Sequence, residues 1–150
     1  MTTQFRDAKR SEVDRVNELF VEMLRSIYHT EEVQGYENGY LERFFEDNED
    51  RILVAEEEEI VAFLSVQVYR QEGYIYLDDL SVSEKYRDRG IGTKLISMAE
   101  AYAKEIRIPA IVFHVEKSNV RAHALYTKLG YLDHEDQGTR ILMVKEWGMN

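Results

Sequence analysis

The chain has 150 residues, 44% of them apolar, no cysteine and a formal net charge of −10 at pH 7. These values predict one compact domain over residues 1–150 and exclude disulfides, thiolate metal sites, a cysteine nucleophile and membrane-spanning helices. The lack of cysteine favours a reducing cytoplasm, the acidity argues against a nucleic-acid partner, and the first ten residues lack the apolar segment of a secretory signal.

An initial strand and two helices are predicted in the first third of the chain. The first helix begins at Ser11, which is able to cap it, and Asp14 lies in the first turn, where the helix dipole favours a negative charge. Apolar residues then recur at steps of three and four and form one face: Val13, Val16, Phe20, Met23 and Ile27. A second, shorter helix is expected from about Tyr36 to Phe45, with four residues facing inward: Tyr40, Leu41, Phe44 and Phe45.

The middle of the chain predicts three strands and a long helix. Apolar stretches at 52–55 and 60–68 flank four consecutive glutamates, a pattern typical of a hairpin with a solvated turn. A third strand is expected from Tyr74 to about Val82, and a helix from near Gly90 to before the only proline. One face of that helix is apolar, and Glu100 and Lys104 are spaced for an ion pair along it.

The last third predicts a strand, a helix and two closing strands. The mostly apolar run 110–115 indicates a buried strand, and the helix at 119–129 ends with Gly130 as its cap. Two strands follow, at 131–133 and 141–147. The resulting order of elements predicts an α/β layered domain with a mixed sheet.

The loop between the third strand and the long helix carries the clearest chemical signal. It contains Arg87, Arg89, Gly90 and Gly92. Glycines let the backbone approach a ligand, a helix start offers unpaired N–H groups with a partial positive charge, and arginines add charged donors. The loop therefore predicts a pyrophosphate site, with a simple tight turn as the alternative.

Two sequence blocks resemble a known family. Arg87-x-x-Gly90-x-Gly92, after a strand and at the start of a helix, resembles the acetyl-CoA signature of the GNAT superfamily of N-acetyltransferases. Asn119-x-x-Ala122-x-x-Leu125-Tyr126-x-x-Leu129-Gly130-Tyr131 resembles the next strand–helix block of that family. The resemblance implies a GNAT-type acyl-CoA N-acyltransferase fold, with a central mixed, mostly antiparallel sheet flanked by helices.

The resemblance also implies how acetyl-CoA is bound as cosubstrate. Its pyrophosphate would sit on the backbone amides of about Arg87 to Thr93, and its pantetheine arm in a gap between the third strand and the strand at 110–115. A bulge in the third strand would present the backbone amides of Leu80 and Val82 to the arm and the thioester. Asn119 contacts the arm in relatives, and a role as helix cap is an equal alternative.

Catalytic residues follow from the same resemblance. Tyr126 matches the general acid that protonates the departing thiolate, with a packed core aromatic as the alternative. The incoming ammonium must lose a proton, and Asp78 and Asp79 are the candidates to receive it. Strand alternation predicts that only one of them points into the cleft. Similarity of Leu-Asp-Asp-Leu to the Leu-Glu-Asp stretch of diamine N-acetyltransferases favours Asp78 as the base, with Asp79 near the substrate and a solvated or paired aspartate as the alternative.

The acceptor is expected to be a small cationic amine such as a polyamine. Glu31 and Glu32 lie in the loop that shapes the acceptor site of relatives, although a plain surface loop is the alternative. The histidines lack metal-ligand spacing, so no metal is expected. Transfer would occur by direct attack in a ternary complex. The alternatives are an acyl-CoA-binding sensor with little turnover and an acetyltransferase for aminoglycosides or peptide amines. Relatives are often homodimers, and the C-terminal strand with Trp147 would serve such an interface.

Overall fold

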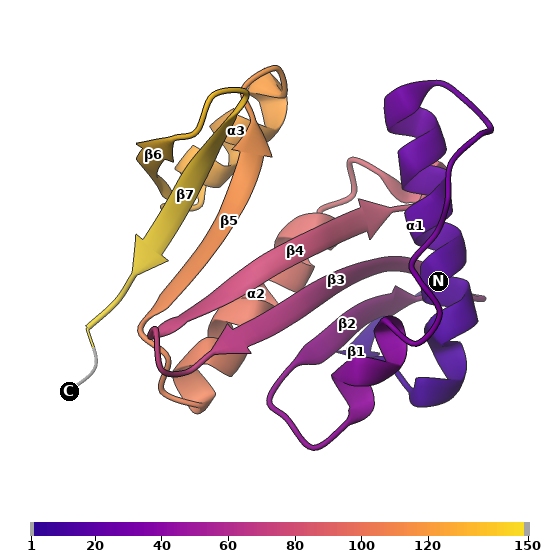
Figure 1. Cartoon of the computed structure of the whole chain (residues 1–150), viewed down its shortest axis with the longest axis horizontal. Helices are drawn as coiled ribbons and strands as arrows, with labels where there is room; N and C mark the ends of the chain where they lie inside the picture. Colours follow the sequence, from indigo (N-terminus) through magenta and orange to yellow (C-terminus); the bar gives the residue numbers. More distant parts are fainter. Residues whose placement is uncertain (1, 149–150) are drawn as a thin grey trace.

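A single sheet organises the chain (Figure 1). The computed structural model describes residues 2–148. Within them, seven strands pair in the order β1-β2-β3-β4-β5-β7-β6. The strands are β1 (Gln4–Asp7), β2 (Arg51–Glu56), β3 (Ile60–Tyr69), β4 (Tyr74–Val82), β5 (Ala110–Glu116), β6 (Leu132–Asp136) and β7 (Arg140–Glu146). Only β4 and β5 are parallel among these neighbours, so the predicted mixed, mostly antiparallel sheet is confirmed.

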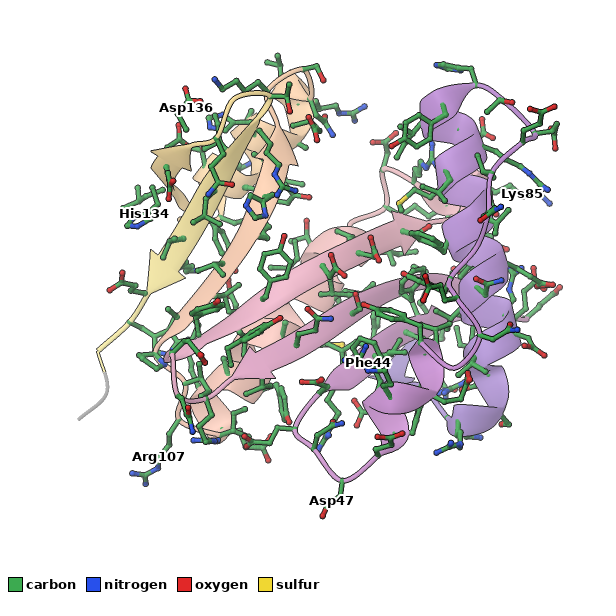
Figure 2. All side chains as sticks on the ribbon, viewed as in Figure 1. Phe44, Asp47, Lys85, Arg107, His134 and Asp136 are labelled. Carbon is green, nitrogen blue, oxygen red and sulfur yellow. The ribbon has the colours of Figure 1, made fainter. Side chains whose placement is uncertain are left out.

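Helices cover both faces of the sheet. They are α1 (Val13–Tyr28), α2 (Ile91–Glu105) and α3 (Val120–Lys128), with short 3-10 helices η1 (Arg10–Glu12), η2 (Leu41–Phe45) and η3 (Glu84–Tyr86). One core lies beneath α1 and η2, where Phe44 points onto the sheet (Figure 2), and the other lies beneath α2 and α3. Strand β2 supplies Ile52 and Val54 to the first core and Leu53 and Ala55 to the second, as the two-residue strand period requires. Among residues 2–148, no helix is long and apolar enough to cross a bilayer.

The first helix begins differently from the expectation. Ser11 does not cap it, because a 3-10 turn comes first and the Glu12 carboxylate accepts a hydrogen bond from the backbone N–H of Lys9 at 2.7 Å. Asp14 lies in the first turn of α1 as predicted. On the predicted apolar face, Val16 is buried, whereas Ile27 is 57% exposed. The end of α1 therefore leaves apolar surface outside the core.

The second helix was predicted too long. Only residues 41–45 are helical, as η2, and the segment before them is a loop with a turn. The side chain of Asn17 on α1 accepts a hydrogen bond from the backbone N–H of Tyr36 at 2.8 Å, so this loop is tied to α1 by a contact that helix periodicity does not encode. Leu41 and Phe44 are buried as expected.

The C-terminal strands are tied to α2 by one carboxylate. The predicted pair between Glu100 and Lys104 is absent among the salt bridges of residues 2–148. Glu100 instead accepts hydrogen bonds from the Tyr131 hydroxyl at 2.8 Å and the Lys145 ammonium at 3.1 Å. The cap at Gly130 is confirmed: its φ is +99°, and the next residue donates its N–H to the Tyr126 carbonyl at 3.0 Å.

Candidate active site

The central strands of the sheet separate along most of their length. Strands β4 and β5 pair only through Ile75 with Ile111 and Tyr76 with Val112. Beyond these pairs the strands diverge, as Figure 1 shows. Two hollows follow the split. The inner hollow, about 280 Å³, lies beside the middle of β4, and the loop hollow, about 730 Å³, lies beside the start of α2. They share lining residues from α1, β4 and α3, so they form one continuous cleft.

The loop hollow is lined by most of the residues predicted to bind acetyl-CoA: Leu80, Val82, Arg87, Gly90, Gly92, Thr93 and Asn119. Gly90 precedes α2 with a φ of +79°, a conformation that glycine adopts without strain. The first helical hydrogen bond is donated by the N–H of Lys94 to the Gly90 carbonyl at 3.0 Å. The N–H groups before Lys94 therefore have no partner within the helix, and the positive end of the helix dipole lies at the hollow.

Three predicted residues lie outside both hollows. The Arg89 guanidinium lies 5.0 Å from the ring centroid of Tyr86 and 3.8 Å from the Glu57 carboxylate. Glu31 is exposed and pairs with Arg25 at 3.2 Å, and Glu32 is exposed as well. The structure therefore does not bring Arg89, Glu31 or Glu32 to the cleft.

A β-bulge places both aspartates in the inner hollow. In the pairing of β3 with β4, Leu64 faces Leu80 but Val66 faces Leu77, so Ser65 stands opposite two residues, Asp78 and Asp79. The Ser65 hydroxyl accepts the Asp79 N–H at 2.9 Å. The expectation that only one aspartate points into the cleft was wrong, because the bulge interrupts the alternation of faces.

Two tyrosines from the loop before η2 hold these aspartates. The Tyr36 hydroxyl donates to Asp79 Oδ2 at 2.5 Å, and the Tyr40 hydroxyl donates to Asp78 Oδ2 at 3.4 Å. The two rings stack with centroids 5.0 Å apart. The sequence analysis did not assign these tyrosines to the site. Their four-residue spacing is typical of one face of a helix, so Tyr40 was expected to face inward in the helix predicted from Tyr36 to Phe45.

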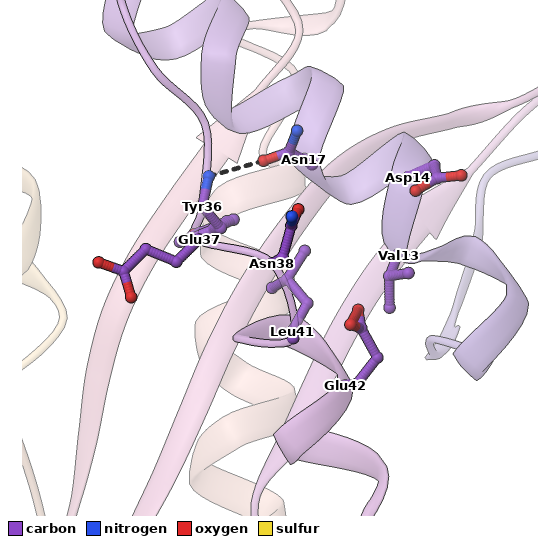
Figure 3. Close-up of a pocket in the computed structure, with 9 residues that line it drawn as sticks. Val13, Asp14, Asn17, Tyr36, Glu37, Asn38, Leu41 and Glu42 are labelled. Carbon is purple, nitrogen blue, oxygen red and sulfur yellow. Dashed lines mark hydrogen bonds between the residues drawn. The ribbon is translucent and has the colours of Figure 1, made fainter.

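The loop that carries Tyr36 packs closely against α1. A hollow of about 320 Å³ lies between them. Figure 3 shows residues that line it and the hydrogen bond from the Tyr36 N–H to Asn17 Oδ1. A Cβ on the preceding residue, Gly35, would lie 2.4 Å from the same Asn17 oxygen. A side chain there would push the loop away from α1, so Gly35 allows the close approach that positions Tyr36.

The electrostatics of the pair are set by burial and by the tyrosines. Burial raises the pKa of Asp78 and of Asp79, and the hydrogen bond from each tyrosine opposes that rise. The charge of Asp78 raises the pKa of Asp79 further. Burial and the nearby carboxylates raise the pKa of Tyr40 to about 12 and raise the pKa of Tyr36 as well. Both tyrosines are therefore neutral donors at pH 7.

Helix α3 brings two further predicted residues to the cleft. Tyr126 lines the inner hollow, packs edge-on against Phe113 with ring centroids 4.6 Å apart, and has its pKa raised by burial alone among residues 2–148. Asn119 Oδ1 accepts the Ala122 N–H at 3.2 Å, which confirms the predicted helix cap. Asn119 also borders both hollows.

His114 is a site residue that the sequence analysis missed. It lies on β5 between Phe113 and Val115, which pack into the α2 core, so strand alternation places it on the opposite face. It lines the inner hollow together with Asp78. The alternation of faces along β5 could be predicted from the sequence. Which of these faces lines the cleft depends on where β4 separates from β5, which the sequence pattern does not give. Among residues 2–148, no group of three or more histidines and carboxylates is arranged to hold a metal ion.

Curated proteins are similar to this chain in sequence. YhfO, an uncharacterized N-acetyltransferase of Bacillus subtilis (strain 168), is 32% identical over 139 residues, which cover 89% of this chain and 91% of YhfO. The D-amino-acid N-acetyltransferase HPA3 of Saccharomyces cerevisiae is 40% identical over 60 residues, which span 40% of this chain and only 37% of HPA3.

Solved structures have a similar fold. PaiA N-acetyltransferase from Thermoplasma acidophilum, solved in complex with coenzyme A, aligns with a TM-score of 0.78 and 19% identity over 98% of this chain and 100% of that chain. Residues 14–131 match the acetyltransferase (GNAT) family. The chain therefore belongs to the GNAT family of N-acetyltransferases.

Proposed function

We propose that this enzyme transfers the acetyl group of acetyl-CoA to a small cationic amine, such as a polyamine, by direct attack in a ternary complex. The observation that carries the proposal is the chemistry of the cleft. One end is a helix-start loop with unpaired amides and an arginine, and the other end holds two adjacent carboxylates. An anionic cosubstrate and a cationic acceptor would thus enter from opposite ends and meet between β4 and β5.

The loop hollow fits the phosphates and arm of CoA. The amides at the start of α2 and the Arg87 side chain would bind the pyrophosphate, since a helix N-terminus is a natural anion site. Leu80 and Val82 follow the bulge on β4 and would offer backbone N–H groups to the arm and the thioester oxygen. The Asn119 amide would contact the arm from α3.

The inner hollow supports the acyl transfer itself. Asp78, with the weaker tyrosine bond of the pair, would receive the proton that the ammonium must lose. The neutral amine nitrogen would then form its bond to the thioester carbon as the carbon–sulfur bond breaks. Tyr126, whose raised pKa keeps the phenol protonated, would give its proton to the departing thiolate and take back the second proton that the amine nitrogen loses as the amide forms.

Charge favours a cationic acceptor over a free amino acid. Asp79 is held by Tyr36 and adds a second negative charge beside Asp78. An acceptor that carries a carboxylate next to its amine would meet repulsion there, whereas an extended polyamine would not. This argues against the D-amino acids named for HPA3, which this chain matches only in part.

The cytoplasmic location and the homodimer stay predictions.

Release of CoA thiol from acetyl-CoA, measured against spermidine, lysine analogues, an aminoglycoside and short peptides, tests the proposal. We expect turnover with spermidine and a rise of at least about 10-fold in its KM for Asp79→Asn, since a charge-assisted contact contributes about 1.5–3 kcal/mol. Tight binding of acetyl-CoA without turnover on any amine would support the sensor alternative. Turnover with peptides or aminoglycosides alone would replace the proposed acceptor.

A further inference from the structure

Acetylation of an ammonium releases one proton for each acetyl group transferred. The cleft therefore needs a path by which that proton reaches solvent while the acceptor and CoA fill the split. Asp78 lines the inner hollow beside a second carboxylate, Asp79. A proton that stays there would leave the next ammonium without a base.

A chain of hydrogen bonds runs from the aspartate side of β4 to the far surface. The Tyr76 hydroxyl lies 2.5 Å from His114 Nδ1, and His114 Nε2 lies 2.8 Å from Gln137 Oε1. The amide oxygen of Gln137 only accepts, so Nε2 carries the ring proton and Nδ1 accepts the Tyr76 proton. The imidazole is therefore held with its basic nitrogen toward Tyr76.

His114 connects two hollows. It lines the inner hollow with Asp78, and it also lines a second hollow of about 520 Å³ together with Tyr76 and Gln137. This second hollow lies on the part of β5 and β7 opposite α3, and His134 on β6 borders it at the outer edge seen in Figure 2. The ring of His114 thus separates the reacting end of the cleft from an open surface.

We propose that Tyr76 and His114 relay the proton of the acceptor from the cleft to this second hollow, an inference that rests on the proposed acetyl transfer. The Tyr76 oxygen takes the proton that Asp78 received as its own proton moves to His114 Nδ1. The imidazolium then loses its Nε2 proton to solvent, and transfer of the remaining ring proton from Nδ1 to Nε2 through solvent restores the starting tautomer. One proton crosses for each amide formed, and no other reactant is required.

The surrounding charges favour this direction. Asp78 on β4 attracts the positive charge that forms on His114. Burial and the charge of Asp78 raise the pKa of Tyr76, and Arg140 on β7 lowers it. The other titratable groups that line the second hollow are Glu72, Tyr74, His134 and Glu146.

The test compares His114→Gln, His114→Ala and Tyr76→Phe with the wild type, using acetyl-CoA and spermidine across a pH series. Glutamine keeps hydrogen bonding but cannot change its charge. We expect kcat/KM near pH 7 to fall by about 10- to 100-fold for each variant. The deficit should shrink as pH rises and the amine loses its proton unaided. Added imidazole should restore part of the activity of His114→Ala, which a purely structural role would not allow.

His123→Gln is the matched control, because that ring pairs with Asp133 at 2.7 Å and lies outside all three hollows; its rates should equal those of the wild type. Circular dichroism checks folding of each variant, and Tyr76→Phe keeps the test open if the His114 variants do not fold. Wild-type rates and pH dependence in Tyr76→Phe or His114→Gln would overturn the relay alone. A wild type that acetylates no amine would overturn the proposed function and the relay together.

Discussion

Tyr126 is held by packing rather than by a polar partner. Its ring rests edge-on against Phe113, and burial raises the pKa of its hydroxyl. We predict that Tyr126→Phe lowers kcat by about 100-fold, the usual effect of removing a general acid, while the affinity for acetyl-CoA changes little. Thiol-release kinetics and calorimetric titration of acetyl-CoA measure the two quantities. Equal losses in both would mean that Tyr126 shapes the cleft instead of donating a proton.

The bond between Tyr36 and Asp79 links the acceptor site to stability. Burial raises the pKa of Asp79 above its unfolded value, so the unfolded chain releases this proton first and stability falls as pH rises through that interval. Because the Tyr36 hydrogen bond opposes the rise, its removal should raise the pKa further and deepen the fall. We predict that Tyr36→Phe is about 1–2 kcal/mol less stable than the wild type at pH 7 and much closer to it at pH 4.

Urea unfolding at the two pH values measures this difference. Tyr40→Phe is the matched control, because its hydroxyl lies 3.4 Å from Asp78 and its loss should have a smaller effect at pH 7. An equal deficit for Tyr36→Phe at pH 4 and pH 7 would show that the energy lost with the hydroxyl does not depend on the charge of the Asp79 carboxylate.

At the scale of elements, two glycines at the start of α2 have different requirements. Gly90 has a φ of +79° and open space where a Cβ would be, so Gly90→Ala meets only backbone strain. At Gly92 a Cβ would make an ordinary contact, 3.5 Å from Leu80 Cδ2, in helical backbone. We predict that Gly90→Ala loses about 1 kcal/mol of unfolding free energy and that Gly92→Ala loses none. A comparable loss in both, by urea unfolding, would contradict this assignment of backbone strain.

The cap of α3 separates two roles of Asn119. Serine keeps an oxygen for the Ala122 N–H but lacks the amide group, whereas alanine lacks both. We predict that Asn119→Ser unfolds like the wild type and binds acetyl-CoA about 3- to 10-fold more weakly, and that Asn119→Ala also loses about 1 kcal/mol of stability. Unchanged acetyl-CoA affinity in Asn119→Ser would leave Asn119 with the capping role only.

Local signals predicted the elements well, because periodicity and glycine positions are properties of neighbouring residues. The strand at 74–82, the start of α2 and the cap at Gly130 followed from such signals. A bulge in this strand was expected from the family resemblance. Its position opposite Ser65, which sets both Asp78 and Asp79 in the cleft, depends on the register against a residue that is distant in sequence. The side chain of Arg89 likewise contacts Glu57, which lies in the turn between β2 and β3 and is distant in sequence.

At the scale of the whole molecule, charge acts on both substrates. The chain carries 29 acidic and 19 basic side chains, which attract a polyamine and repel CoA over the range of the Debye length. CoA is therefore expected to rely on the local donors of the α2 loop, whereas the acceptor gains from the entire surface. The two substrates should consequently respond to salt in opposite ways.

We predict that kcat/KM for spermidine falls by about 5- to 10-fold between 20 and 300 mM NaCl, because salt screens the attraction of an acidic surface for a polycation. The KM for acetyl-CoA should stay level or decrease over the same range, and a neutral-side-chain monoamine should show a smaller decline than spermidine. Steady-state rates in a buffer of fixed pH measure all three. In Asp78→Asn, the salt dependence of kcat/KM for spermidine that remains measures the attraction exerted by the rest of the surface. If that slope vanishes, Asp78 alone attracts the acceptor; if spermidine and the monoamine decline in parallel, charge does not select the substrate.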